Sequence, residues 1–263
     1  MKIRLLSPLV ACTVLLGALG LALSGAPAQA ADLSHTIAAV KGAIVGVGTF
    51  QRTRSPSIVF GGTAFVVGDG LSVITNSHTV PELLDTEKME TLCIVIGKGD
   101  SVDYRPAVLV ARDREHDLAH LRLTGAPLPA LQLGEAPLAA EGRDLAFTGF
   151  PLGMVLGLHH VTHRAMLSAV TPVVMPSLNS QKLDIKTLAQ LQRNPFPVYQ
   201  LDGTAYPGNS GSPVYDPETG VVLGVVNMVY VRGLKETAIT QPSGITYAMP
   251  VQYVRELLQR KSP

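Results

Sequence analysis

Short apolar runs with the character of β-strands dominate the chain after residue 42. Turn signals punctuate them, among them Gly61-Gly62, Gly68-Asp69-Gly70, Gly97-Lys98-Gly99 and Asp216-Pro217. Many short strands at this spacing predict an all-β protein, built as barrels or as a sandwich. The predicted strands are Ala43–Gly48, Ser57–Val67, Ser72–Thr75, Leu92–Ile96, Ala107–Ala111, Leu118–Leu123, Asp144–Thr148, His159–Ser168, Val198–Leu201, Val221–Val231 and Gly244–Ala248.

Three segments are predicted to be helical instead: Leu33–Lys41, Gln181–Gln192 and Val251–Lys261. In the last of them apolar residues form one stripe, and the basic residues at its C-terminal end suit the helix dipole. The proline-rich joint Ala126–Pro129 and the stretch Glu135–Ala140 are predicted to carry the crossover between two lobes.

The first thirty residues have the organisation of a signal peptide. Lys2 and Arg4 make a basic start, Leu5–Leu23 is apolar, and Ala28–Ala30 has the small-x-small pattern that a signal peptidase cleaves. Cleavage there would leave residues 31–263 as one exported domain, located in the periplasm or outside the cell.

Two other interpretations of the same segment stay open. Leu9–Cys12 resembles a lipoprotein processing box. Leu5–Leu23 is also nearly long enough to act as an uncut anchor, because a membrane span takes about 20 apolar residues. The chain would contact a membrane only if this segment stayed uncleaved.

Charge and composition limit the partners and the cysteine chemistry that the chain is expected to have. A formal net charge of +1 gives no electrostatic reason to expect nucleic acid or an acidic partner. After signal cleavage Cys93 would be the single cysteine, so no intrachain disulfide could form. Its apolar neighbours predict a buried thiol rather than a reactive one. With 46% hydrophobic residues, the chain can rely on its core for stability.

The segment Pro207–Pro213 can supply part of the chemistry of nucleophilic acyl transfer. That chemistry needs an exposed hydroxyl, a base, an orienter for the base, and N–H donors for the oxyanion. Ser210 stands between Gly208 and Gly211, and glycines there allow unusual backbone angles and close approach of a substrate carbonyl. Taken alone, the segment could equally be a plain turn.

Two further polar positions complete the set. His78 stands in a polar tip after the apolar pair Val73-Ile74, and Asp117 precedes the strand-like run Leu118–Leu123. Each of them is more often structural when met alone. Histidine and aspartate lie in the first half of the chain and Ser210 in the second, which is the order of the chymotrypsin-type triad.

Several segments stand in an order that a known family shares. They are Gly62–Val67, Thr75–His78, Asp117–Ala119, Gly149–Gly153, Gly208–Pro213, Gly224–Asn227 and Gly244–Pro250. With them the chain resembles the chymotrypsin-like clan and, within it, the HtrA/Deg-type trypsin-like peptidases, over about residues 33–261. The resemblance implies two six-stranded antiparallel β-barrels, over about 43–125 and 140–250, and a C-terminal helix over 251–261. The active site would lie in the cleft between the barrels.

The chain departs from the family's pattern in three ways. It stops one helix after Pro250, where such enzymes commonly carry a PDZ domain, so we expect an HtrA-like protease domain without that module. Ser212 stands where the family usually has glycine, as in the neighbouring glutamyl endopeptidases. Met175–Pro195 is longer than expected, and a regulatory loop or a plain surface insertion fits it equally well.

Each candidate residue has a predicted role. Ser210 would attack the peptide carbonyl, His78 would move the proton, and Asp117 would orient and stabilise the imidazole. The N–H groups of Gly208 and Ser210, with that of Asn209, would form the oxyanion hole. We therefore predict a serine endopeptidase that acts on protein or peptide substrates through an acyl-enzyme. The alternative is a latent or inactive protease-like chaperone or binding protein.

The primary specificity pocket is predicted around Thr204, Asn227, Met228 and Val229. Thr204 stands where the resemblance places the pocket floor, and no acidic residue is there. The absence of an acidic residue argues against a preference for Arg or Lys. Met228 and Val229 should narrow the pocket, so small or medium aliphatic side chains are the predicted preference.

The histidine-rich segment His159–His163 suggests a metal site at first sight. In a strand, His159 and His163 would share one face while His160 took the other, so three ligands would converge poorly. We predict no metal site and no cofactor. The sequence is compatible with an oligomer.

Overall fold

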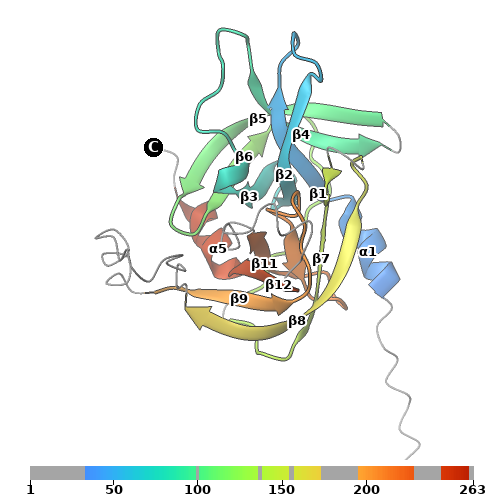
Figure 1. The fold of residues 1–263 in the computed structure, drawn as a ribbon, viewed down its shortest axis with the longest axis vertical. Coiled ribbons are helices and arrows are strands. Elements are labelled where there is room, and N and C mark those ends of the chain that lie inside the picture. Colours follow the sequence, from blue (N-terminus) through green and yellow to red (C-terminus); the bar gives the residue numbers. More distant parts are fainter. Residues whose placement is uncertain are drawn as a thin grey trace, which may run out of the picture. The chain divides into compact units, whose positions relative to one another are not determined.

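The computed structural model describes residues 33–98, 101–135, 138–153, 157–172, 195–227 and 244–260. Their strands form two closed six-stranded antiparallel barrels, which confirms the predicted fold class. In Figure 1 the chain completes the first barrel before it enters the second.

The first barrel has the strand order β1-β2-β3-β6-β5-β4. Helix α1 (Leu33–Lys41) precedes it, and a 3-10 turn, η1 (Ser77–Thr79), follows its third strand. Both the N-terminal helix and the closed barrel agree with the sequence prediction. The strands are β1 (Ile44–Phe50), β2 (Ile58–Val67), β3 (Ser72–Asn76), β4 (Thr91–Lys98), β5 (Ser101–Asp113) and β6 (Leu118–Leu123).

The second barrel has the strand order β10-β11-β12-β9-β8-β7. The predicted C-terminal helix follows it as α5 (Val251–Gln259). The strands are β7 (Asp144–Gly149), β8 (Val161–Pro172), β9 (Pro197–Asp202), β10 (Pro213–Tyr215), β11 (Val222–Asn227) and β12 (Ile245–Pro250).

Two strands differ clearly from the sequence prediction. β5 begins at Ser101, whereas the sequence predicts a start at Ala107. The first half of the strand was missed because it is largely polar and exposed and is defined by its pairing with β4. β10 was not predicted, because three residues directly after a glycine-rich loop carry no periodicity. Both are defined as strands by pairing with a neighbouring strand rather than by a residue pattern of their own.

Some predictions fall on residues outside the described ranges. These are the signal segment 1–30, the helix Gln181–Gln192, nearly all of the 175–195 insertion, and the end of the run Val221–Val231. Among the described residues, no helix is both long enough and apolar enough to cross a bilayer.

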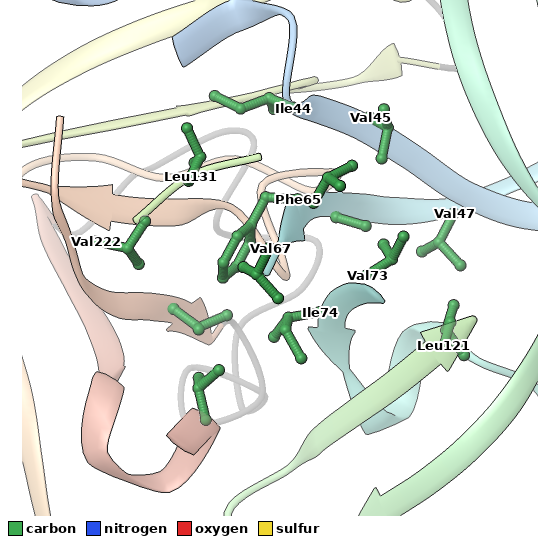
Figure 2. Packing of buried hydrophobic residues seen from close by; sticks show 14 of the residues in the cluster. Ile44, Val45, Val47, Phe65, Val67, Val73, Ile74, Leu121, Leu131 and Val222 are labelled. Atoms are coloured by element: carbon green, nitrogen blue, oxygen red, sulfur yellow. The ribbon is translucent and has the colours of Figure 1, made fainter. Parts of the chain in front are cut away.

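The core of the first barrel extends beyond that barrel. Phe65 of β2 and Ile74 of β3 are fully buried within it. Figure 2 shows this cluster, which also contains Leu131 of the crossover and Val222 of β11. Leu257 of α5 is buried in the same cluster. The C-terminal helix therefore contributes to the core of the first barrel, although it follows the second in sequence.

The crossover joins the two barrels through backbone bridges. Val67 of β2 pairs with Leu131, and Leu133 pairs with Val222 of β11. The crossover therefore contacts one strand of each barrel, through Leu131 and through Leu133, and these contacts fix its path.

Cys93 on β4 is fully buried, in agreement with the sequence prediction. Burial raises the pKa of its thiol to about 11, so the thiol stays protonated near neutral pH. A protonated, inaccessible thiol is a poor nucleophile, and Cys93 therefore has no part in the chemistry considered below.

Buried histidines should make the fold sensitive to acid. His120 lies inside the first barrel, and neither ring nitrogen has a hydrogen-bond partner among the described residues. Burial, and next the Arg122 charge, lowers the pKa of His120, and burial also lowers the pKa of His160 and of His163. The unfolded chain therefore takes up protons first as the pH falls below about 6.5. The free energy of unfolding should therefore decrease as the pH falls further, until these histidines are also protonated in the folded state.

Thermal unfolding at pH 7.5 and at pH 5.5 measures this effect. We expect a lower melting temperature at pH 5.5, and a smaller decrease in His120→Phe, which keeps the ring and removes the titrating nitrogens. An equal or higher melting temperature at pH 5.5 would show that the histidines do not limit stability there.

Candidate active site

Within the predicted triad, His78 lies within hydrogen-bonding distance of both Asp117 and Ser210. His78 is in η1 after β3, Asp117 ends the turn between β5 and β6, and Ser210 is in the loop between β9 and β10. His78 Nδ1 lies 2.6 Å from Asp117 Oδ2, and His78 Nε2 lies 3.0 Å from Ser210 Oγ. The His78 side chain is 22% exposed and that of Asp117 15%, so solvent and a substrate can reach the imidazole.

Asp117 is fixed through its backbone as well as its carboxylate. Its φ of +51° is in the left-handed region, which aspartate tolerates better than most residues. Its carbonyl accepts hydrogen bonds from Ser77 N–H (3.0 Å) and from Asn76 Nδ2 (3.1 Å). Its Oδ1 accepts from His78 N–H at 2.9 Å. Both carboxylate oxygens therefore bind the same histidine residue, one to its backbone and one to its ring.

Asn227 brings the second barrel into contact with this carboxylate. It is the last residue of β11 and is fully buried. Its Nδ2 donates to Asp117 Oδ2 at 3.1 Å. The sequence analysis predicts that Asn227 contributes to the specificity pocket. In the structure its side-chain amide forms a hydrogen bond with Asp117. A signal was present, because a buried amide at the end of an apolar strand needs a polar partner.

Arg112 of β5 braces the segment that carries His78. Its Nη1 donates to Ser77 O (3.1 Å) and Val80 O (3.2 Å), and its Nη2 donates to Pro81 O (3.1 Å). The Arg112 side chain is only 12% exposed, so water competes little for these carbonyls. A planar guanidinium with several donors suits such a set of acceptors.

Thr63 of β2 connects the first barrel to the loop of Ser210. Its N–H donates to Ser210 O at 2.9 Å. Its Oγ1 donates to Gly208 O (2.7 Å) and accepts from Phe150 N–H (3.0 Å). At Gly211, where φ is +86°, a Cβ would lie 2.0 Å from Thr63 O, so only glycine fits. These contacts fix the position of the loop that carries Ser210 relative to the first barrel.

The peptide between Pro207 and Gly208 is oriented by a backbone hydrogen bond. Leu152 N–H donates to Pro207 O at 2.7 Å. Because the C=O and N–H of one trans peptide point in opposite directions, Gly208 N–H faces away from Leu152. Gly208 has a φ of +103°, and a Cβ there would lie 2.3 Å from Phe150 O. The N–H groups of Gly208 and Ser210 have no acceptor within the described part of the chain.

Asn209 and Ser212 face the interior behind this loop. Asn209 N–H donates to Tyr206 O (2.9 Å), so it is engaged within the loop. Both side chains are fully buried, and Ser212 Oγ has no hydrogen-bond partner among the described residues. A Cβ on Gly149 would lie 2.0 Å from Ser212 Oγ. The serine that departs from the family's pattern therefore occupies space that Gly149 leaves open.

The predicted pocket floor is connected to β12. Thr204 is half-buried. Thr246 Oγ1 binds the two residues that flank Thr204 in sequence: it donates to Gly203 O (2.6 Å) and accepts from Ala205 N–H (3.0 Å). Thr246 is fully buried and was not singled out in the sequence, because its role depends on pairing of β9 with β12. Two predicted pocket residues lie outside the described ranges, Met228 and Val229.

The histidine-rich segment is used in packing. His159 and His160 precede β8, and His163 alone is in the strand. A ring nitrogen of His160 lies 2.8 Å from Ile44 O, and His163 stacks on Phe147 with ring centroids 4.8 Å apart. The described residues contain no group of three His, Cys, Asp or Glu side chains placed to hold a metal ion.

The chain is similar to known serine proteases. The profile of the trypsin-like peptidase domain matches residues 62–225. The mitochondrial serine protease HTRA2 of Drosophila pseudoobscura pseudoobscura is 28% identical over 205 residues, which cover 78% of this chain and 40% of that protein. A probable periplasmic serine endoprotease DegP-like from Halomonas elongata is 24% identical over 196 residues, covering 74% of this chain and 34% of that protein. The chain therefore spans less than half the length of these relatives.

Solved structures share the fold. The serine endoprotease from Yersinia pestis has a TM-score of 0.59 and 19% identity, covering 87% of this chain and 65% of that one. The active form of the Rv3671c protease from M. tuberculosis has a TM-score of 0.58 and 22% identity, covering 85% and 82%. These likenesses concern the double barrel alone. Because the family profile matches more than half of its residues, this chain belongs to the trypsin-like peptidase domain family.

Proposed function

We propose that this chain is a serine endopeptidase whose catalytic triad is Ser210, His78 and Asp117. One observation carries the proposal. An unbroken hydrogen-bonded chain runs from Asp117 Oδ2 to the His78 ring (2.6 Å) and from that ring to Ser210 Oγ (3.0 Å). Both distances are within the range in which an oriented general base can take a hydroxyl proton. Membership of a peptidase family supports the same chemistry.

Acylation would begin with attack of Ser210 Oγ on the carbonyl carbon of the scissile bond, while His78 Nε2 takes the hydroxyl proton. Asp117 would accept the Nδ1–H, which keeps the lone pair on Nε2, and would stabilise the imidazolium. The carbonyl oxygen becomes an oxyanion, for which we assign the N–H groups of Gly208 and Ser210 as donors. We leave Asn209 out of the oxyanion hole, because its N–H is already engaged within the loop.

The remaining steps use the same catalytic groups. The C–N bond breaks, and His78 gives its proton to the departing amine, which leaves an ester on Ser210. Water then attacks the ester carbonyl, and His78 takes a proton from that water. The C–O bond to Ser210 breaks, the acid product leaves, and the proton returns to the serine oxygen.

Substrate preference is proposed from the pocket floor. Thr204 and its described neighbours Gly203, Ala205 and Thr246 carry no charge, so a cationic side chain would find no counter-ion among them. We expect small or medium aliphatic side chains before the scissile bond. Cleavage of a peptide library measures this preference, and a strong selection of Arg, Lys or Glu would refute it.

Export is proposed from the N-terminal sequence. Residues 1–30 have the organisation of a signal peptide, and relatives such as that of Halomonas elongata are described as periplasmic. The purified exported protein should begin at Ala31. An intact mass that still contains Leu5–Leu23 would show that the segment is retained as an anchor.

Hydrolysis of fluorescent casein by the purified protein tests the proposed function. We expect turnover that a fluorophosphonate inhibitor abolishes, because the inhibitor consumes the activated serine. Absence of turnover by folded protein would instead favour the alternative of a latent or inactive protease-like binding protein.

A further inference from the structure

His116 stands directly before Asp117, and its ring packs on elements from the second half of the chain. The ring stacks on Tyr253 of α5, with centroids 3.8 Å apart and planes 15° from parallel. Phe196, just before β9, contacts it nearly edge-on with centroids 4.5 Å apart. His116 is buried, as is Tyr253. Two elements therefore converge on the neighbour of the proposed catalytic carboxylate.

Asp113, the last residue of β5, completes this arrangement. Its Oδ1 accepts hydrogen bonds from Glu115 N–H and His116 N–H, both at 3.1 Å. Its Oδ2 lies 2.8 Å from His116 Nδ1 and 2.6 Å from Nη2 of Arg260. One carboxylate therefore fixes the turn that leads into Asp117 and also holds the histidine ring within that turn.

The Asp113 carboxylate keeps its charge over the working range of pH. Its side chain is only 3% exposed, and burial by itself raises its pKa. The hydrogen bonds from the ring and backbone of His116, with the charges of His116 and Arg260, outweigh burial and lower that pKa to about 2. The contacts described above are therefore made by an ionised carboxylate at any pH at which the enzyme would be assayed.

We propose that His116 is a positioning residue for Asp117, held in place by Asp113 and by Tyr253 of α5. The inference rests on the proposed function. Asp117 has a φ of +51°, and such a backbone persists only where its surroundings determine it. His78 and Asn227 hold its carboxylate on the side of the active site. A second set of contacts, here called the His116 cluster and made by Asp113, His116 and Tyr253, holds the residue that precedes Asp117 in the same turn.

The contacts of α5 explain how a C-terminal element can act at this point. α5 packs against β5 and β6, the two strands that the turn connects, and Figure 1 shows it next to this part of the first barrel. Loosening the cluster would let the turn shift, and a displacement of about 1 Å in a catalytic group can cost about 100-fold in rate.

Steady-state kinetics of His116→Phe tests the inference. The variant keeps an aromatic ring for Tyr253 and loses the hydrogen bond to Asp113. We expect kcat/KM to fall by about 10- to 100-fold, with KM changed less than about threefold, because substrate contacts are untouched. The acid limb of kcat/KM should also move to lower pH, because a displaced Asp117 stabilises the charged His78 less. Partial rescue is expected in His116→Asn, whose Nδ2 can replace Nδ1 on Asp113 but which lacks a ring to stack on Tyr253.

Two further variants keep the test decisive. Arg260→Gln alters a half-exposed partner of Asp113 and should fold even if His116→Phe does not; it should lower kcat/KM in the same way by a few-fold. His35→Phe, on the exposed face of α1, is the matched control and should leave both parameters unchanged.

The outcomes separate the two proposals. Wild-type kcat/KM and an unmoved acid limb in folded His116→Phe, or in Arg260→Gln if the former does not fold, would overturn the positioning role. Undiminished turnover by Ser210→Ala would overturn the proposed function itself, whatever the His116 variants do.

Discussion

Replacing Ser210 with alanine is expected to lower kcat for casein or peptide hydrolysis by about a million-fold. The methyl group cannot attack a carbonyl, and no acyl-enzyme can form. What remains would come from substrate binding and the oxyanion donors alone, which retain only about 10³–10⁴ of the acceleration over water. The fold should be unaffected, because Ser210 is held by its backbone carbonyl on Thr63 N–H rather than by its hydroxyl.

Ser212→Ala is the matched control for this experiment. The two serines are two positions apart, but Ser212 is fully buried and its hydroxyl has no partner among the described residues. We expect its kcat to stay within about twofold of wild type, with equal or slightly higher stability, since removing an unpaired buried hydroxyl relieves a desolvation cost of about 1 kcal/mol. Equal loss of turnover in both variants would point to damage of the loop rather than to loss of a nucleophile.

Asp117→Asn is expected to lower kcat by about 10⁴-fold while leaving the fold intact. The reason lies in the donors that surround the carboxylate. Oδ1 accepts from His78 N–H, so the amide oxygen of asparagine should take that place. The amide NH2 would then face His78 Nδ1, which must become an acceptor. The ring proton would move to Nε2, where the lone pair for Ser210 is needed.

Kinetics over a range of pH measures this effect, with Asp144→Asn as control because Asp144 is exposed at the start of β7. Activity of Asp117→Asn should recover partly at high pH, where hydroxide can take the serine proton in place of His78. A kcat within about tenfold of wild type would mean that Asp117 does not orient His78.

The proposed triad could be recognised in the sequence because each of its members lies in a segment with characteristic neighbours. Ser210 has flanking glycines that the backbone needs, as the positive φ angles at Gly208 and Gly211 show. His78 and Asp117 follow and precede apolar strands, and the order of the three along the chain selected one arrangement of barrels.

The hydrogen bonds that hold the site together could not be predicted in the same way, because they join residues that are far apart in the sequence. Thr63 and Gly208 are separated by 145 positions, and Asn227 and Asp117 by 110. No local pattern of polar and apolar residues records such a contact. His116 is a further case, since its neighbour Asp117 was singled out while the ring's partners belong to α5 and to the approach to β9.

The strands show the same limit. β6 was predicted with its observed bounds because its residues are nearly all buried. β10 and the first half of β5 are strands only because a neighbouring strand pairs with them. Burial of apolar side chains leaves a pattern in the sequence, whereas the backbone pairing of an exposed or very short strand does not.

Mapping of a covalent fluorophosphonate adduct tests the central claim most directly. The purified protein is treated with the probe, digested, and analysed by tandem mass spectrometry, with Ser210→Ala in parallel. The proposed triad predicts one adduct per chain, on Ser210, and none in the variant. An adduct on another residue, or no adduct on folded wild-type protein, would contradict it.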